Sequence, residues 1–84
     1  METENITTLD KLNIGDSCVV KKLSCSNVLK EKFVNFGIIE GTHITAVFKS
    51  PFNNPVAFDI RNKVIAIRNS DAAKIMVQKK NPNY

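Results

Sequence analysis

The chain has 84 residues, of which 43% are hydrophobic and 24% are charged, and its formal net charge is +4. A chain of this length can support one small core, so we expect a single domain. No apolar run approaches the roughly 20 residues that a membrane-spanning helix needs, and the acidic start METEN does not resemble a signal peptide. We therefore expect one cytoplasmic domain over residues 1–84, without membrane insertion, with its core at about 8–78 and a flexible tail at 79–84.

Positive charge is concentrated toward the C-terminal end. Residues 1–60 carry six Lys and seven Asp or Glu, a net charge of −1, whereas residues 61–84 carry six Lys or Arg and one Asp, a net charge of +5. A basic end of this kind can contact an acidic protein, a phosphate-rich ligand or an anionic membrane surface. It can equally be a solvated face that keeps the protein soluble.

Residues suited to catalysis or metal binding are few and scattered. Cys18 and Cys25 are expected to be free thiols in a reducing compartment. His43 is the single histidine, which argues against a catalytic triad and against the multi-ligand sites that hold iron. We therefore expect no catalytic residue, no metal site and no cofactor, and a protein that is not an enzyme.

The first elements predicted are a turn and a strand. Residues 8–15 predict a turn whose apolar side chains, Leu9, Leu12 and Ile14, can close one end of a core. Residues 16–23 are rich in β-branched side chains and predict the first strand.

A short amphipathic helix follows. Ser26 can cap its first turn, and Gly37 can end it in the left-handed conformation. The apolar residues expected on its buried side are Val28, Leu29, Phe33 and Phe36.

The middle of the chain predicts a strand and a loop. Residues 42–48 alternate in polarity, which places Ile44, Ala46 and Phe48 on one face of a strand. Residues 50–55, with Pro at two of six positions, predict a loop.

The last third predicts a hairpin, a helical turn and a strand. Residues 56–61 and 64–68 form the hairpin, joined by a turn at residues 62–63. Ser70 is expected to cap the helical turn, and residues 75–78 predict the final strand. Five short strands with brief links favour a mainly β fold, a small SH3-like five-stranded antiparallel barrel with one short amphipathic helix and one helical turn.

Four strings of residues resemble the FeoA family. They are TLDKLNIG at 8–15, FVNFGIIEGT at 33–42, SPFNNPV at 50–56 and IAIRNSDAAKI at 65–75. Each alone is a common turn signature, whereas the four in this order cover nearly the whole chain. The chain departs from the family pattern at Lys32 and Phe33 and at Asn62, which stands where the hairpin turn commonly carries Gly.

FeoA proteins accompany FeoB, a membrane-embedded ferrous-iron transporter with a cytosolic GTP-binding domain. The resemblance implies an SH3-like accessory protein that docks on the cytosolic part of a FeoB-type GTPase and modulates iron uptake. The same domain also forms the tail of some metal-dependent repressors, so the resemblance implies the fold more directly than the partner. A regulatory module for some other protein, and weak self-association, stay open.

A free-standing nucleic-acid-binding barrel is the main alternative. The basic C-terminal end favours it. The expected absence of a stacking platform argues against it, because most of the five Phe alternate onto core faces.

Three apolar residues have no evident place in the core and are candidates for partner binding. Val34 lies opposite Leu29 and Phe36 on the helical wheel, and Ile39 lies in the turn that follows the helix. Phe52 lies at the tip of the Pro-bounded loop. Together, Val34, Ile39 and Phe52 would form an apolar docking patch.

Overall fold

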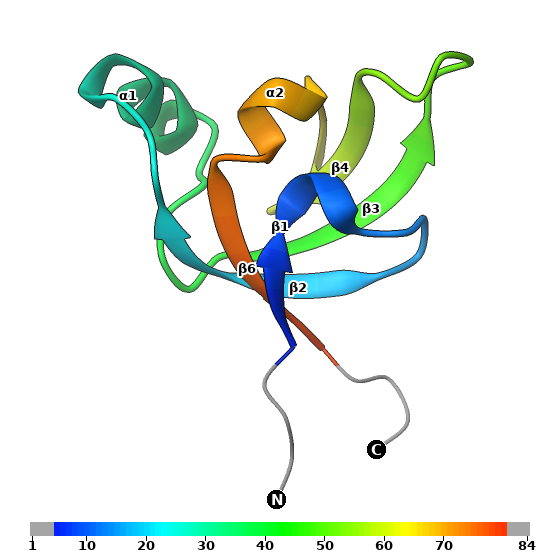
Figure 1. Cartoon of the computed structure of the whole chain (residues 1–84), viewed down its shortest axis with the longest axis horizontal. Coiled ribbons are helices and arrows are strands. Elements are labelled where there is room, and N and C mark those ends of the chain that lie inside the picture. The colour runs from blue at the N-terminus through cyan, green and yellow to red at the C-terminus, as the bar shows by residue number, and fades with distance from the viewer. Residues whose placement is uncertain (1–4, 81–84) are drawn as a thin grey trace, which may run out of the picture.

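The computed structural model describes residues 5–80, in which a curled antiparallel sheet runs beneath two helices (Figure 1). The elements, in chain order, are β1 (Ile6–Thr8), the 3-10 turn η1 (Leu9–Lys11), β2 (Ser17–Leu23), α1 (Asn27–Asn35), β3 (His43–Lys49), β4 (Val56–Ile60), β5 (Lys63–Ile67), α2 (Asn69–Ala72) and β6 (Ile75–Lys79). The mainly β prediction is confirmed, with six strands where five were expected.

The strand order is β1-β6-β2-β3-β4-β5, and β2 holds the sheet together because it pairs with β3 on one side and β6 on the other. β1 and β5 stand at the two edges, and no described residue of one pairs with the other. The sheet therefore has the curl of a barrel without its closure.

β1 is the strand that the sequence pattern did not predict. It has three residues, too few to show alternation, and it forms because β6 offers a partner along the register Ile6↔Gln78 and Thr8↔Met76. The strand is thus a product of pairing rather than of local sequence.

Buried apolar side chains fill the inside of the curl. They come from η1, α1, α2 and the strands: Leu9, Leu12, Cys18, Val20, Phe33, Ile38, Ile44, Ala46, Val56, Phe58, Ile60, Ile67, Ala72, Ile75 and Val77. Ile14, expected with Leu9 and Leu12, is instead 45% exposed. It lies at the corner of a tight turn in which the Asp16 N–H donates to the Asn13 carbonyl at 2.9 Å.

The α1 helix begins as predicted, with the Leu29 N–H donating to Ser26 Oγ at 3.3 Å. Phe33 is the buried residue of this helix, and the partly buried Leu29 and Phe36 pack against the edge of the core. Val28 was wrongly placed on the buried side, since it is 81% exposed. One buried ring in the second turn, with Leu29 at the edge of the core, is enough to dock so short a helix, and Val28 lies on the solvent side of the first turn.

The turn from α1 to β3 is held by Thr42, a buried polar residue. Its hydroxyl donates to the Gly37 carbonyl at 3.0 Å and accepts from the Ile39 N–H at 3.1 Å. The Thr42 carbonyl accepts from the Val20 N–H at 2.9 Å, which ties the turn to β2. Gly37 and Gly41 supply the positive φ angles, 88° and 92°, that the path requires.

A β-bulge in β3 reverses one prediction. Ala46 pairs with Phe58 and Phe48 pairs with Ala57, so Val47 is an extra residue in β3. Phe48 therefore leaves the face that carries Ile44 and Ala46, and it is 59% exposed rather than buried.

The hairpin turn lies one residue earlier than predicted. Ile60 pairs with Lys63, so the two turn residues are Arg61 and Asn62, with φ of 53° and 69°. Two successive positive φ angles match the twist of a two-residue hairpin.

The cap of α2 and the end of β6 also differ from expectation. Arg68, not Ser70, stands at the N-cap of α2. β6 extends to Lys79, whose Nζ lies 3.3 Å from Asp16 Oδ2. The Lys80 N–H donates to the Ser17 carbonyl at 2.9 Å, so the first two residues of the predicted flexible tail are held by the sheet. Residues 81–84 of that tail lie outside the described residues.

We predict that Thr42→Val lowers the free energy of unfolding by about 1–2 kcal/mol, because the Ile39 N–H loses its acceptor and the Gly37 carbonyl loses its donor in a partly buried turn. Urea denaturation measures the change. Thr42→Ser keeps the hydroxyl and is the matched control, with a clearly smaller loss expected. Equal losses in the two variants would contradict the role given to the hydroxyl.

Candidate protein-docking surface

The loop between β3 and β4, residues 50–55, is built by its own polar groups. The Asn53 N–H donates to the Ser50 carbonyl at 2.9 Å, and the Asn54 N–H donates to Ser50 Oγ at 3.0 Å. Asn53 has φ of 64°, a left-handed conformation that Asn tolerates better than most residues. The loop therefore has a defined shape before any partner arrives.

Asn69, the first residue of α2, fixes this loop to the body of the protein. Its N–H donates to Asn54 Oδ1 at 2.9 Å, and its Nδ2 donates to the Asn53 carbonyl at 2.9 Å. The amide oxygen of Asn54 thus supplies an acceptor at the start of α2 that the sequence analysis assigned to Ser70. Nothing in the local sequence indicates this contact, because the partners are 15 and 16 residues apart.

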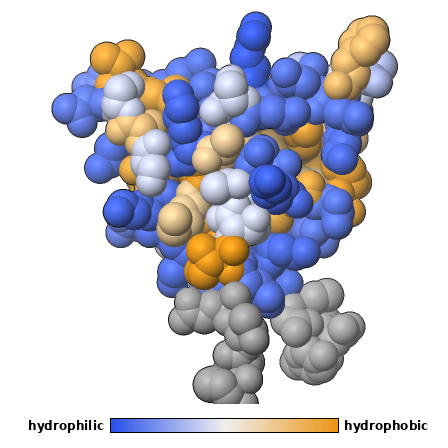
Figure 2. Space-filling view, viewed as in Figure 1, coloured by the Kyte–Doolittle hydropathy of each residue, from blue (hydrophilic) through white to orange (hydrophobic). Residues whose placement is uncertain are grey.

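Phe52 projects from the fixed loop, with 88% of its surface exposed. In Figure 2 the end of this loop forms an orange projection beyond a mostly blue surface. An aromatic side chain held out on an ordered loop is suited to binding, since little conformational entropy remains to be lost.

Val34 and Ile39 are also exposed, at 47% and 44%, but they lie elsewhere. Val34 belongs to α1 and Ile39 to the turn after it, whereas Phe52 belongs to the β3–β4 loop. Figure 1 shows α1 and this loop at opposite ends of the long axis, with α2 between them. The structure therefore does not bring the three predicted residues together into one patch.

Phe48 is an exposed aromatic that the sequence analysis placed in the core. The bulge turns it outward, opposite Ala57, in the strand that leads into the loop. Strict alternation predicts the wrong face here, and a bulge has no reliable signature in a single sequence. The segment around the β3–β4 loop thus exposes two of the five Phe side chains.

A shallow hollow of about 490 Å³ lies between the α1–β3 turn and the β4–β5 hairpin. His43, Glu40, Asp59 and Arg61 stand among its lining residues. Within residues 5–80, no group of three or more His, Cys, Asp or Glu side chains could hold a metal ion.

The two thiols have different surroundings. Cys18 is buried in β2 and Cys25 is partly buried. Burial raises the pKa of the Cys18 thiol from its ordinary 9.0 to about 11, although the positive charge of Lys80 opposes the shift. Cys18 is therefore a packing residue that stays protonated at neutral pH.

None of the helices in the described part of the chain has the length and apolar character of a membrane span.

A family model described as the FeoA domain matches residues 7–79. The chain belongs to the FeoA family. A curated relative from Porphyromonas gingivalis (strain ATCC BAA-308 / W83), an Fe(2+) transport protein A/Fe(2+) transporter FeoB fusion protein, is 31% identical over 70 residues. The match covers 83% of this chain, and the chain spans 8% of the length of that relative.

Solved structures of FeoA proteins share the fold. Iron(II) transport protein A from Clostridium thermocellum is 32% identical, with a TM-score of 0.82 over 86% of this chain and 44% of that chain. A FeoA from Stenotrophomonas maltophilia complexed with zinc, an SH3 domain protein, is 22% identical, with a TM-score of 0.76 over 89% of this chain and 96% of that chain. The curled sheet of this FeoA-family protein is therefore an SH3-like fold.

We predict that one thiol per chain reacts readily with a disulfide reagent at pH 8, and that both react after unfolding in urea. Cys25 is the reactive thiol, because burial keeps Cys18 protonated and inaccessible. Absorbance of the released thiolate measures the count. In Cys25→Ser the fast phase should disappear, and a fast phase that persists in this variant would show that Cys18 is accessible.

Proposed function

We propose that this FeoA-family chain is a cytoplasmic accessory protein of ferrous-iron uptake, which docks on the cytosolic part of a FeoB-type transporter and modulates its activity. The observation that carries the proposal is the fusion of a similar FeoA sequence to FeoB in the Porphyromonas gingivalis relative. Fusion keeps two domains at high effective concentration, which is useful where they act on one another.

The structure supports action by binding rather than by chemistry. The most exposed large apolar side chain of the described residues, Phe52, lies on a loop that is already ordered by Ser50 and Asn69. We propose this loop as the first docking element for the transporter. Val34 and Ile39 stay as a second, separate candidate at the α1 end.

The test is binding of the isolated cytosolic domain of the cognate FeoB-type protein to wild type and to Phe52→Ser. Losing a central aromatic anchor commonly costs about 2 kcal/mol of binding free energy, which is about a thirtyfold weaker affinity. Thermal unfolding of the variant should match wild type, because Phe52 buries little surface. Isothermal titration calorimetry measures the affinity.

Val28→Ser is the matched control. Val28 is 81% exposed and lies on α1, away from the loop, so its loss should change neither stability nor docking. If Phe52→Ser docks normally, the interface does not include the loop tip. The α1 end is then the next candidate, and Val34→Ser and Ile39→Ser are the variants that test it. Absence of binding by the wild type would contradict the proposed function itself.

Nucleic-acid binding is the second candidate, and the exposure of Phe48 and Phe52 favours it more than the sequence did. We expect only weak binding to single-stranded RNA, with an affinity that falls steeply as salt rises, because contacts to phosphate dominate. Fluorescence anisotropy at two salt concentrations measures this. Sequence-selective binding that survives physiological salt and is lost in Phe52→Ser would favour the nucleic-acid function.

A further inference from the structure

The β5 strand has a free edge. It is last in the strand order, and among the described strands it pairs with β4 alone. Ile60 and Lys63 close a two-residue hairpin and form a hydrogen-bonded pair, so the alternation of an antiparallel ladder makes Ile65 and Ile67 the next residues that bond to β4. The N–H and C=O groups of the residues between them, Val64 and Ala66, point away from β4.

This edge is open to solvent. Val64 is 61% exposed and Ala66 is also exposed, whereas Ile67, whose side chain faces the core, is buried. Backbone groups of an uncovered edge strand are ready to pair with another extended chain. Val64 and Ala66 together offer two donors and two acceptors.

A groove of about 140 Å³ runs beside the same strand, between β5, α1 and α2. Its apolar walls are Phe33 of α1, Phe36 at the C-cap of that helix, and Ala66 and Ile67 of β5. A chain added to β5 would carry side chains alternately toward this groove and away from it. The groove can therefore accept every second side chain of an added strand, and small apolar ones suit it best.

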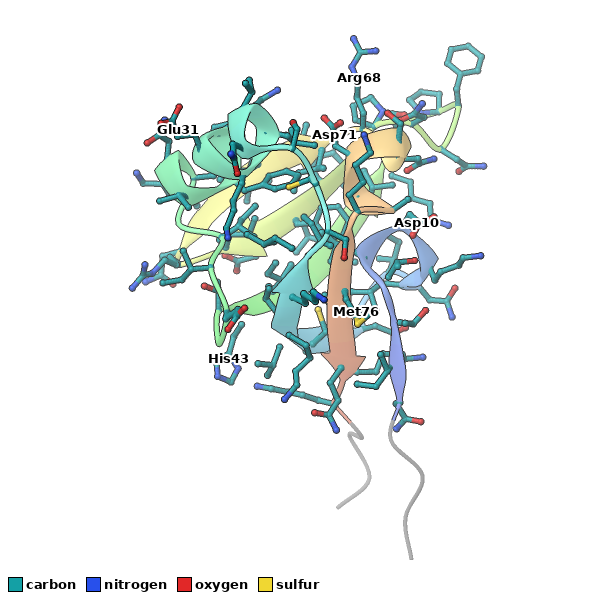
Figure 3. All side chains as sticks on the ribbon, turned by 60° about the vertical axis from the view of Figure 1, so that its left-hand side comes forward. Asp10, Glu31, His43, Arg68, Asp71 and Met76 are labelled. Carbon is teal, nitrogen blue, oxygen red and sulfur yellow. The ribbon has the colours of Figure 1, made fainter. Side chains whose placement is uncertain are left out.

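Charge around the edge is mainly positive. Lys32 and Arg68 line the groove together with one acid, Asp71, and Lys63 begins the strand. Figure 3 shows Arg68 and Asp71 beside α2, and Glu31 on the side of α1 that faces away from them.

At the hairpin end of the strand, Arg61 adds a further cation. Its side chain lies against the end of α1, with Cδ 2.9 Å from the position that a Cβ on Gly37 would take. Two acids lie near this end, Asp59, which pairs across the hairpin with Val64, and Glu40, which lines the same hollow as Arg61. The groove itself has two cations, Lys32 and Arg68, against one acid, and the edge and groove together have four cations against three acids.

We propose that the β5 edge is a second binding site, which takes an extended acidic segment of a partner protein by strand addition. The segment pairs its backbone with Val64 and Ala66, places alternate apolar side chains against Phe36 and Ile67 on the groove side, and matches its acidic residues to Lys32, Lys63 and Arg68. Backbone pairing supplies affinity, and the groove and cations select the sequence.

The same charges argue against a second copy of this chain as the occupant. In an antiparallel pair of two β5 strands, the outward N–H and C=O groups meet when Val64 lies opposite Ala66 of the other copy. This register brings Lys63 next to the other copy's Ile67 and Arg68. Each copy would add the same cations to one small interface, and like charges across paired strands are destabilising. An acidic segment meets no such repulsion.

This site uses the backbone of β5 and the groove beside it rather than the β3–β4 loop, although its Arg68 directly precedes Asn69, which bonds to that loop. The inference does not depend on the identity of the partner that the loop contacts.

The test uses a fluorescent peptide of about eight residues in which Val and Glu alternate, a length typical of a strand. We expect binding to the monomer, with NMR shifts and slowed hydrogen exchange at the Val64 and Ala66 amides. Two N-methylated peptides are compared, one methylated at all Val amides and the other at all Glu amides. One of them should lose binding and the other should keep it, because only one edge of the peptide pairs with β5. A peptide with Lys in place of Glu should bind at least about tenfold more weakly.

Two protein variants test the edge and the charges separately. Ala66→Pro removes an outward N–H and leaves the bonds to β4, and Pro is tolerated on edge strands; it should weaken binding by about tenfold or more. The double variant Lys32→Glu/Arg68→Glu should also weaken peptide binding by about tenfold or more. Lys21→Glu/Lys22→Glu makes the same charge change at exposed positions of β2 outside the groove and is the matched control.

Several outcomes would overturn the proposal. If both methylated peptides bind like the parent, or if the two double variants weaken binding equally, attraction is by charge alone and no strand is added. If the alternating Val and Glu peptide does not bind at all, the proposal that an acidic segment occupies the β5 edge is wrong. If sedimentation shows a dimer that Ala66→Pro disrupts, a second copy occupies the edge. Should Ala66→Pro fail to fold, the methylated peptides and the charge variants still decide.

Discussion

The hydroxyl of Thr42 is the interaction on which the arrangement of this protein depends most. It bonds to both sides of the turn that follows α1, while the backbone of the same residue is tied to β2. α1 is short and contributes one fully buried side chain, Phe33, so its own packing fixes its place only weakly. The turn sets where the helix lies against the sheet, and with it the width of the groove beside β5.

A chain of 84 residues can fill one core and little more. The features suited to recognition therefore lie outside that core and are fixed by polar contacts instead of by burial. The β3–β4 loop shows this, because two hydrogen bonds from Asn69 hold a segment that has Phe52 at its tip. The same residue begins α2, so the loop and the helix keep a fixed relation to one another.

The open sheet has a functional consequence. A closed barrel would have no free edge, whereas here β1 and β5 stay unpaired with one another over the described residues. β1 is only three residues long, a length that gives little template for pairing. β5 is longer, is exposed at Val64 and is flanked by cations. These cations favour pairing of its free edge with an acidic chain and disfavour pairing with a second copy of the protein.

The sequence by itself determined the features whose causes lie within a few residues. These include the cap at Ser26, the left-handed Gly37 at the end of α1, the Pro-bounded loop and the four strings that indicate the FeoA family. Only the tertiary structure decided the bulge that turns Phe48 outward, the pairing that creates β1, the separation of Phe52 from Val34 and the free edge of β5. Each of these depends on which distant strand or loop supplies a partner. Propensity and spacing along one chain do not contain that information, because pairing energy is shared between segments far apart in sequence.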